Sequence, residues 1–117
     1  MVNHSHSRAQ ALARSLDLTF QALADATRRD ILARLSRGPA SVSELARPLE
    51  MSLPAVLQHI AVLEQSGLVH TEKLGRVRTC RADPKALDAA EQWLHKRRAE
   101  WEVRLDRLGR YLDNPEE

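Results

Sequence analysis

Residues 52–66 combine an apolar stripe with an outer face that carries one amide side chain. In a helix, Val56, Ile60 and Leu63 share one face, and Gln58 points almost directly away from them. A glutamine amide donates and accepts together, which suits pairing with adenine in the major groove of DNA. An ordinary amphipathic surface helix has the same pattern, so this segment alone leaves both interpretations open. The residues expected to contact DNA from this helix are Ser52, Leu53, Pro54, Leu57, Gln58, His59 and Ala61.

A basic stretch follows this helix in the chain. Between positions 73 and 82 it holds four basic residues and no acidic one: Lys73, Arg76, Arg78 and Arg81. Residues 68–73 and 77–81 alternate with a period of two around a turn that contains Gly75, which predicts a β-hairpin with Arg76 at its tip. Cations on such a hairpin, chiefly Lys73, Arg76 and Arg78, can follow a phosphate backbone or enter a narrow minor groove. The alternative is a solvated edge strand protected by charge. Because the hairpin follows the helix pair, we favour the contact with DNA over this alternative.

Capping signals mark where the neighbouring helices begin. Asp25 and Ser52 are expected N-caps, and Ser41 with Glu44 three residues on forms a capping box. Together with the apolar periodicity, these signals predict five helices, at about residues 9–24, 26–37, 42–49, 52–66 and 85–112. The expected fold is therefore mainly α with a small β-hairpin, in the order α-α-α-α-β-β-α. Two short helices, a tight turn and a hairpin make a winged helix-turn-helix.

The composition of the 117 residues fits one small domain. Apolar residues make up 43% of the chain but only four are Phe, Trp or Tyr, which favours an aliphatic core of packed helices. Net charge is +2, which is compatible with a nucleic acid partner without requiring one. The single cysteine excludes an internal disulfide and fits the cytoplasm. No apolar stretch is long enough to cross a membrane. The sequence shows no nucleophile with an adjacent base, so we do not expect an enzyme.

We expect three regions along the chain: a disordered N-terminus over residues 1–8, a winged helix-turn-helix domain with flanking dimerisation helices over 9–112, and an acidic tail over 113–117. The N-terminus contains His4 and His6, which could hold a metal loosely, although a frayed terminus is the simpler interpretation.

The chain resembles a known family in several motifs that keep their order and spacing. These are residues 22–32 (ALADATRRDIL), 43–46 (SELA), 52–64 (SLPAVLQHIAVLE) and 67–69 (GLV), within a similarity that spans about residues 20–87. They are similar to the ArsR/SmtB family of bacterial repressors. The resemblance implies a homodimer bound to a palindromic operator on double-stranded DNA and released or retained by an effector.

The chain departs from the metal-sensing members of that family. Many of them carry a cysteine pair in the helix that here spans residues 42–47, where this chain has no cysteine. Others bind metal through the terminal helix, which here has a single histidine, His95. Since zinc needs three or four convergent ligands, we expect no metal site and no cofactor. Leu57 replaces the small polar residue of many members, which leaves the base preference at that position open.

Four further residues have two interpretations each. His59 either contacts phosphate or packs locally, and Arg28 with Arg29 either hold phosphates or are surface charges. Cys80 lies among arginines that could activate its thiol as a redox sensor, but a buried structural thiol is the more common case.

The terminal helix has apolar residues at seven-residue intervals, which is typical of packing against another helix. Its 28 residues span roughly 42 Å, longer than a domain of this size can cover, so we expect a partner subunit rather than the chain's own domain to cover it. The expected dimer contacts on the first and last helices are Leu12, Leu16, Phe20, Leu94, Trp101, Leu105, Leu108 and Leu112.

Overall fold

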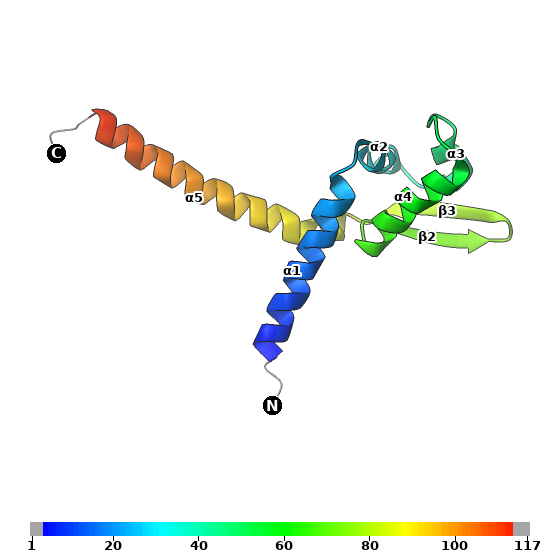
Figure 1. Ribbon diagram of the computed structural model, residues 1–117, viewed down its shortest axis with the longest axis horizontal. Coiled ribbons are helices and arrows are strands. Elements are labelled where there is room, and N and C mark those ends of the chain that lie inside the picture. The colour runs from blue at the N-terminus through cyan, green and yellow to red at the C-terminus, as the bar shows by residue number, and fades with distance from the viewer. Residues whose placement is uncertain (1–3, 114–117) are drawn as a thin grey trace.

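The computed structural model describes residues 4–113 as a small winged domain from which two helices project (Figure 1). Its elements are α1 (His4–Leu23), α2 (Ala26–Leu35), β1 (Ala40–Ser41), α3 (Val42–Ala46), α4 (Leu53–Gln65), β2 (Val69–Leu74), β3 (Val77–Ala82), the 3-10 helix η1 (Pro84–Leu87) and α5 (Asp88–Asp113). The predicted fold class is confirmed, with one additional short strand, β1.

Local capping explains why the central helices begin where they do. The Ser41 side chain accepts from the Glu44 backbone N–H at 3.1 Å, and the Glu44 carboxylate accepts from the Ser41 backbone N–H at 3.5 Å, as a capping box requires. Ser52 caps α4 by accepting from the Ala55 backbone N–H at 3.3 Å. Helix α3 ends at Ala46, earlier than predicted, because Pro48 has no backbone N–H with which to continue the helical hydrogen bonds.

The sheet has three antiparallel strands in the order β1-β3-β2. The hairpin β2–β3 was predicted. Strand β1 was not, because its two residues are too few to show the alternating pattern of a strand. Ala40 pairs with Cys80 and Ser41 with Thr79, so this short strand ties the start of α3 to the base of the hairpin.

Aliphatic side chains from α2, α4 and the sheet form the core. Ile31, Val56, Ile60, Leu63 and Val69 are all at most 2% exposed. They cluster together as one set of buried residues, so the core rigidly connects α4 to the sheet.

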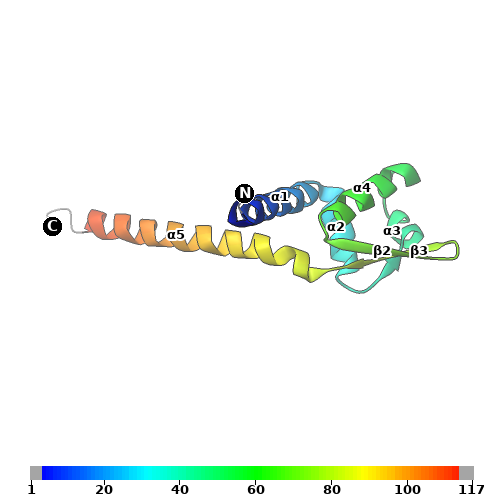
Figure 2. The same ribbon diagram turned by 90° about the horizontal axis from the view of Figure 1, so that it is seen from below.

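Helices α1 and α5 extend away from this core, which makes the molecule 72 Å long and only 22 Å in its shortest dimension (Figure 2). Helix α1 begins at His4, five residues before the start expected at about residue 9, and residues 1–3 lie outside the described part. The terminal segment begins with η1 rather than with the single helix expected from residue 85. Of the expected acidic tail, 113–117, only Asp113 lies in the described part, as the last residue of α5.

Candidate nucleic-acid interface

Helix α4 has the orientation that the sequence predicts. Val56, Ile60 and Leu63 face the core and are at most 1% exposed. Pro54, Gln58 and Ala61 are exposed on the other side, and Leu53 and Leu57 are 52% and 36% exposed. The helix therefore presents one amide and several aliphatic side chains to solvent, groups that suit base edges and thymine methyls.

The hairpin β2–β3 forms a wing beside this helix. Leu74 pairs with Val77, so Gly75 and Arg76 make a two-residue turn. Gly75 has a φ of +63°, and the first central position of a type II′ turn requires such a positive φ, which glycine adopts without strain. Arg76 is exposed at the tip, as predicted.

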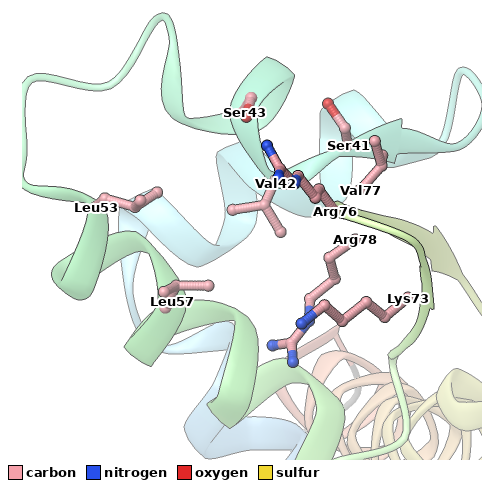
Figure 3. Close-up of a pocket in the computed structure, with 9 residues that line it drawn as sticks. All are labelled: Ser41, Val42, Ser43, Leu53, Leu57, Lys73, Arg76, Val77 and Arg78. Carbon is pink, nitrogen blue, oxygen red and sulfur yellow. The ribbon is translucent and has the colours of Figure 1, made fainter.

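A cleft of about 390 Å³ lies between α3, α4 and the wing (Figure 3). Nine residues line it and none is acidic: Ser41, Val42, Ser43, Leu53, Leu57, Lys73, Arg76, Val77 and Arg78. Figure 3 shows the Lys73 and Arg78 side chains reaching from the wing toward α4. The cleft thus joins aliphatic groups of α4 to three cations of the wing. The α3 side of the cleft, Ser41 to Ser43, was not predicted, because no pattern in the sequence connects these residues to the hairpin.

Lys73 and Arg78 are directly opposite each other across the two strands. Cross-strand neighbours share one face of the sheet, and like charges in that position are destabilising. Neither residue forms an ion pair with any carboxylate among residues 4–113. An arrangement that costs stability and lies in a cleft is well suited to an external anion.

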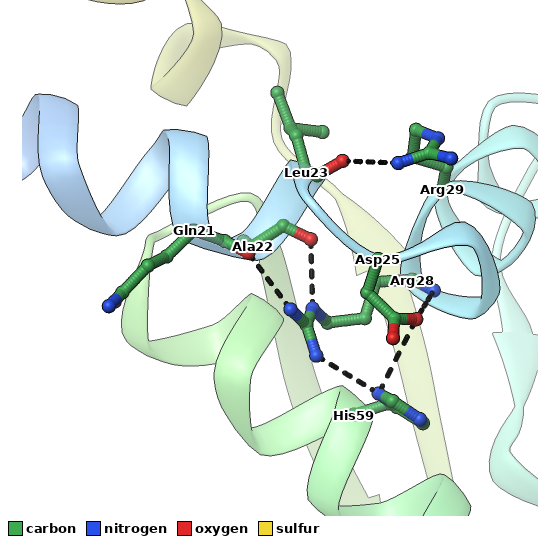
Figure 4. Close-up of polar contacts among 7 residues, drawn as sticks. All are labelled: Gln21, Ala22, Leu23, Asp25, Arg28, Arg29 and His59. Atoms are coloured by element: carbon green, nitrogen blue, oxygen red, sulfur yellow. Dashed lines mark hydrogen bonds and ion pairs between the residues drawn. The ribbon is translucent and has the colours of Figure 1, made fainter.

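Arg28 and Arg29 lie near the start of α2, and their side chains reach back to the C-terminal end of α1 (Figure 4). The Arg28 guanidinium donates to the backbone oxygens of Ala22 and Gln21, at 2.8 and 2.9 Å. Arg29 donates to the Leu23 oxygen at 2.8 Å. Cations that satisfy the last carbonyls of a helix stabilise its C-terminus. Both arginines therefore have internal partners, which favours a structural role for them over the predicted contact with phosphates.

His59 also has internal partners, although it follows Gln58 on α4. Its Nδ1 lies 3.2 Å from Nη1 of Arg28 and 3.9 Å from Oδ1 of Asp25. The hydrogen bond from the backbone N–H of Arg28 lowers the pKa of the Asp25 carboxyl, against an opposing effect of burial. These contacts favour the interpretation of His59 as a locally packed residue over a contact with phosphate.

Cys80 is fully buried on β3. Burial raises the pKa of its thiol, and the nearby Glu64 carboxylate adds to this, with only partial compensation from Arg78. An inaccessible thiol that resists ionisation is a poor nucleophile. The structure thus favours a structural thiol over a redox sensor.

The helices expected to dimerise have large apolar side chains in solvent. Trp101, Leu105 and Leu112 are each at least 65% exposed, and Leu12, Leu94 and Leu108 more than half. Phe20 is 38% exposed and packs edge-on against Trp93, with ring centroids 6.0 Å apart, whereas Leu16 is half-buried. Neither α1 nor the winged domain covers the C-terminal half of α5 (Figure 1).

Comparison with known proteins agrees with this architecture. A helix-turn-helix domain family matches residues 23–72. The HTH-type transcriptional regulator Rv2034 of Mycobacterium tuberculosis is 50% identical over 76 residues, which are 65% of this chain and 71% of that protein. A crystal structure of an ArsR family transcriptional regulator, RHA00566, is 52% identical with a TM-score of 0.74, over 77% of this chain and 93% of that chain. This chain belongs to the ArsR family of transcriptional regulators.

A third relative shares the architecture at lower identity. The homodimeric winged helix-turn-helix DNA-binding domain Mb0332 of Mycobacterium bovis is 25% identical with a TM-score of 0.63, over 82% of this chain and 88% of that chain. The matched domain, residues 23–72, includes α2, α3, α4 and most of β2 of this ArsR family regulator. These elements contain the outer face of α4 and one strand of the wing, so the chain is a DNA-binding transcriptional regulator.

Residues 4–113 contain no group of three or more His, Cys, Asp or Glu side chains that could hold a metal ion. Over the same range, no helix has the length and apolar character needed to span a membrane.

Proposed function

We propose that this ArsR family regulator is a dimeric repressor that binds a palindromic operator in the cytoplasm and is released or retained by an effector of unknown identity. The cleft between α4 and the wing carries this proposal, because three cations and an aliphatic helix face meet there without an acidic residue. A protein that follows a phosphate backbone while it reads bases needs both kinds of group side by side.

In the proposed complex, α4 enters the major groove and the wing follows the adjoining backbone. Gln58 pairs with a base, most favourably adenine, and Leu57 contacts a thymine methyl. Ser52, Leu53, Pro54 and Ala61 complete the surface of α4, while Lys73 and Arg78 neutralise phosphate. Arg76 contacts the sugar-phosphate edge from the tip of the wing.

The proposed dimer uses α1 and α5, whose apolar side chains lie in solvent in one protomer. The homodimeric Mb0332 domain supports this arrangement by similarity. A dimer with two-fold symmetry presents two copies of α4, and two-fold symmetry in the protein is mirrored in the operator. A palindromic site is therefore the expected partner.

Selection of bound sequences from a pool of random duplexes tests both parts of the proposal. We expect enrichment of a palindrome with two half-sites. A single half-site would contradict the dimer, whereas loss of all binding would favour the alternative function, a protein-interaction module with a winged-helix fold. A shift of random duplex DNA that weakens steeply with salt would oppose that alternative, because it reports phosphate contacts.

A further inference from the structure

We propose that Arg28 is a positioning residue that fixes the recognition helix α4 against the dimerisation helix α1 by way of His59. This inference rests on the proposed function of α4 in reading DNA. It adds that the position of α4 is fixed by a residue outside the proposed DNA surface. The evidence is a set of contacts that brings three helices together at one guanidinium (Figure 4).

The first contacts tie α2 to the end of α1. Nε of Arg28 donates to the Ala22 oxygen at 2.8 Å, and Nη2 donates to the Gln21 oxygen at 2.9 Å. Asp25, in the short connection between the helices, accepts from the Arg28 backbone N–H at 3.1 Å and so caps α2. Arg28 therefore has a fixed position relative to both helices.

The remaining guanidinium nitrogen makes the connection to α4. Nη1 of Arg28 lies 3.2 Å from Nδ1 of His59, which is half-buried. An arginine nitrogen can only donate, so Nδ1 must accept and the ring proton must lie on Nε2. His59 directly follows Gln58 and precedes the buried Ile60, so the bond holds α4 at the level of its proposed base contact.

This link connects two determinants of operator recognition, the spacing of the half-sites and the choice of bases. The spacing of half-sites depends on how the dimer helices hold the two winged domains. Base choice depends on the orientation of α4. Because Arg28 bonds to α1 and α4 together, displacement of α1 relative to the winged domain moves the anchor of α4.

Arg29 provides a matched control on the same helix. It also donates to a carbonyl at the end of α1, the Leu23 oxygen at 2.8 Å, and it is exposed. Figure 4 shows its side chain pointing away from α4, and it contacts no residue of that helix within hydrogen-bonding distance. Arg29→Ala therefore removes one arginine and one α1 cap but leaves the link to α4 intact.

The decisive experiment measures affinity for operator and random duplexes across a salt series. We expect Arg28→Ala and Arg28→Lys both to weaken operator binding by about 3- to 10-fold, because lysine keeps the charge but cannot make three directed bonds. Random duplex affinity and the salt slope should stay unchanged, and Arg29→Ala should behave like the unmodified protein. If Arg28→Lys restores full affinity and Arg28→Ala lowers the salt slope by about one, Arg28 contacts phosphate and the inference is wrong.

A double-mutant cycle tests the path through His59. In a His59→Ala background, Arg28→Ala should change operator affinity by less than about 2-fold, since the shared contact is already absent. Undiminished loss in that background would overturn the proposed path. Thermal unfolding of each variant separates a local displacement of α4 from general loss of the fold.

A measurement without DNA keeps this inference distinct from the proposed function. Nitrogen NMR of the His59 ring should show a proton on Nε2 in the unmodified protein and a changed Nδ1 signal in Arg28→Ala but not in Arg29→Ala. A proton on Nδ1 in the unmodified protein would contradict the link. Failure of the unmodified protein to bind any duplex, with the ring signals as expected, would instead contradict the proposed function.

Discussion

At the scale of single residues, the exposed amide of Gln58 is the group best suited to discriminate between bases. We expect Gln58→Ala to lower operator affinity and to leave random duplex affinity unchanged. The loss of a bidentate base contact corresponds to about 1–3 kcal/mol of discrimination. Equilibrium binding to both duplexes measures it, and an equal loss on both would mean that α4 does not read bases.

Arg76 belongs to the same scale but has a different expected effect. Its cation lies at the wing tip, where it meets the backbone whichever bases are beneath it. Arg76→Ala should weaken operator and random duplexes alike and reduce the salt slope by about one. Arg81→Ala is the control, because Arg81 is an exposed arginine of the same hairpin, on β3, but does not line the cleft. Unchanged affinity in Arg76→Ala would show that the wing tip does not contact DNA.

The third residue, Cys80, should be chemically inert in the folded protein. Its thiol is buried and its pKa is raised, so little thiolate forms and reagents cannot reach it. We expect alkylation by iodoacetamide at pH 8 to be slow in the native state and rapid in denaturant. Mass spectrometry of timed samples measures both rates, and rapid native labelling would reopen a redox function.

At the scale of elements, α5 contributes an apolar row that its own protomer does not cover. Leu105→Asp should convert the proposed dimer to a monomer, because a buried charge at a helix interface is strongly unfavourable. Arg104→Ala, on the neighbouring exposed position, is the control. Sedimentation at micromolar concentration should give twice 13.2 kDa for the unmodified chain and for the control. A monomeric unmodified chain would contradict the proposed dimer.

The connections between elements depend on polar contacts at their ends. At the base of the wing, Nε2 of His70 lies 2.8 Å from Oδ2 of Asp83. Oδ1 of Asp83 also accepts from the Lys85 backbone N–H at 3.0 Å. The hydrogen bond from His70 lowers the pKa of the Asp83 carboxyl. These bonds connect the wing to the start of η1, and through it to α5.

At the scale of the whole molecule, we expect DNA binding to be independent of added metal. The chain has no cysteine in α3, and α5 carries only His95 as a potential nitrogen ligand. Titration of zinc, cadmium or cobalt into the protein–operator complex should leave the complex intact, because these ions need several convergent ligands. Stoichiometric release at micromolar metal would show that a metal site forms in the complete dimer.

The sequence by itself determined the elements whose signals are local. Caps at Asp25, Ser41 and Ser52, together with the spacing of Val56, Ile60 and Leu63, predicted where helices begin and which face of α4 is buried. These features depend on residues a few positions apart, so the sequence contains all the relevant information. Similarity of motifs to the ArsR family extended the prediction to the DNA-binding class.

Only the tertiary structure decided how distant segments meet. The bond between Arg28 and His59 joins residues 31 positions apart, and it favours a local structural role for both side chains. The pairing of β1 with β3 and the closure of the cleft by Ser41 and Ser43 likewise have no local signal. Burial likewise favoured the structural thiol among the two interpretations of Cys80. Such contacts depend on the packing of the complete chain, which composition and periodicity do not specify.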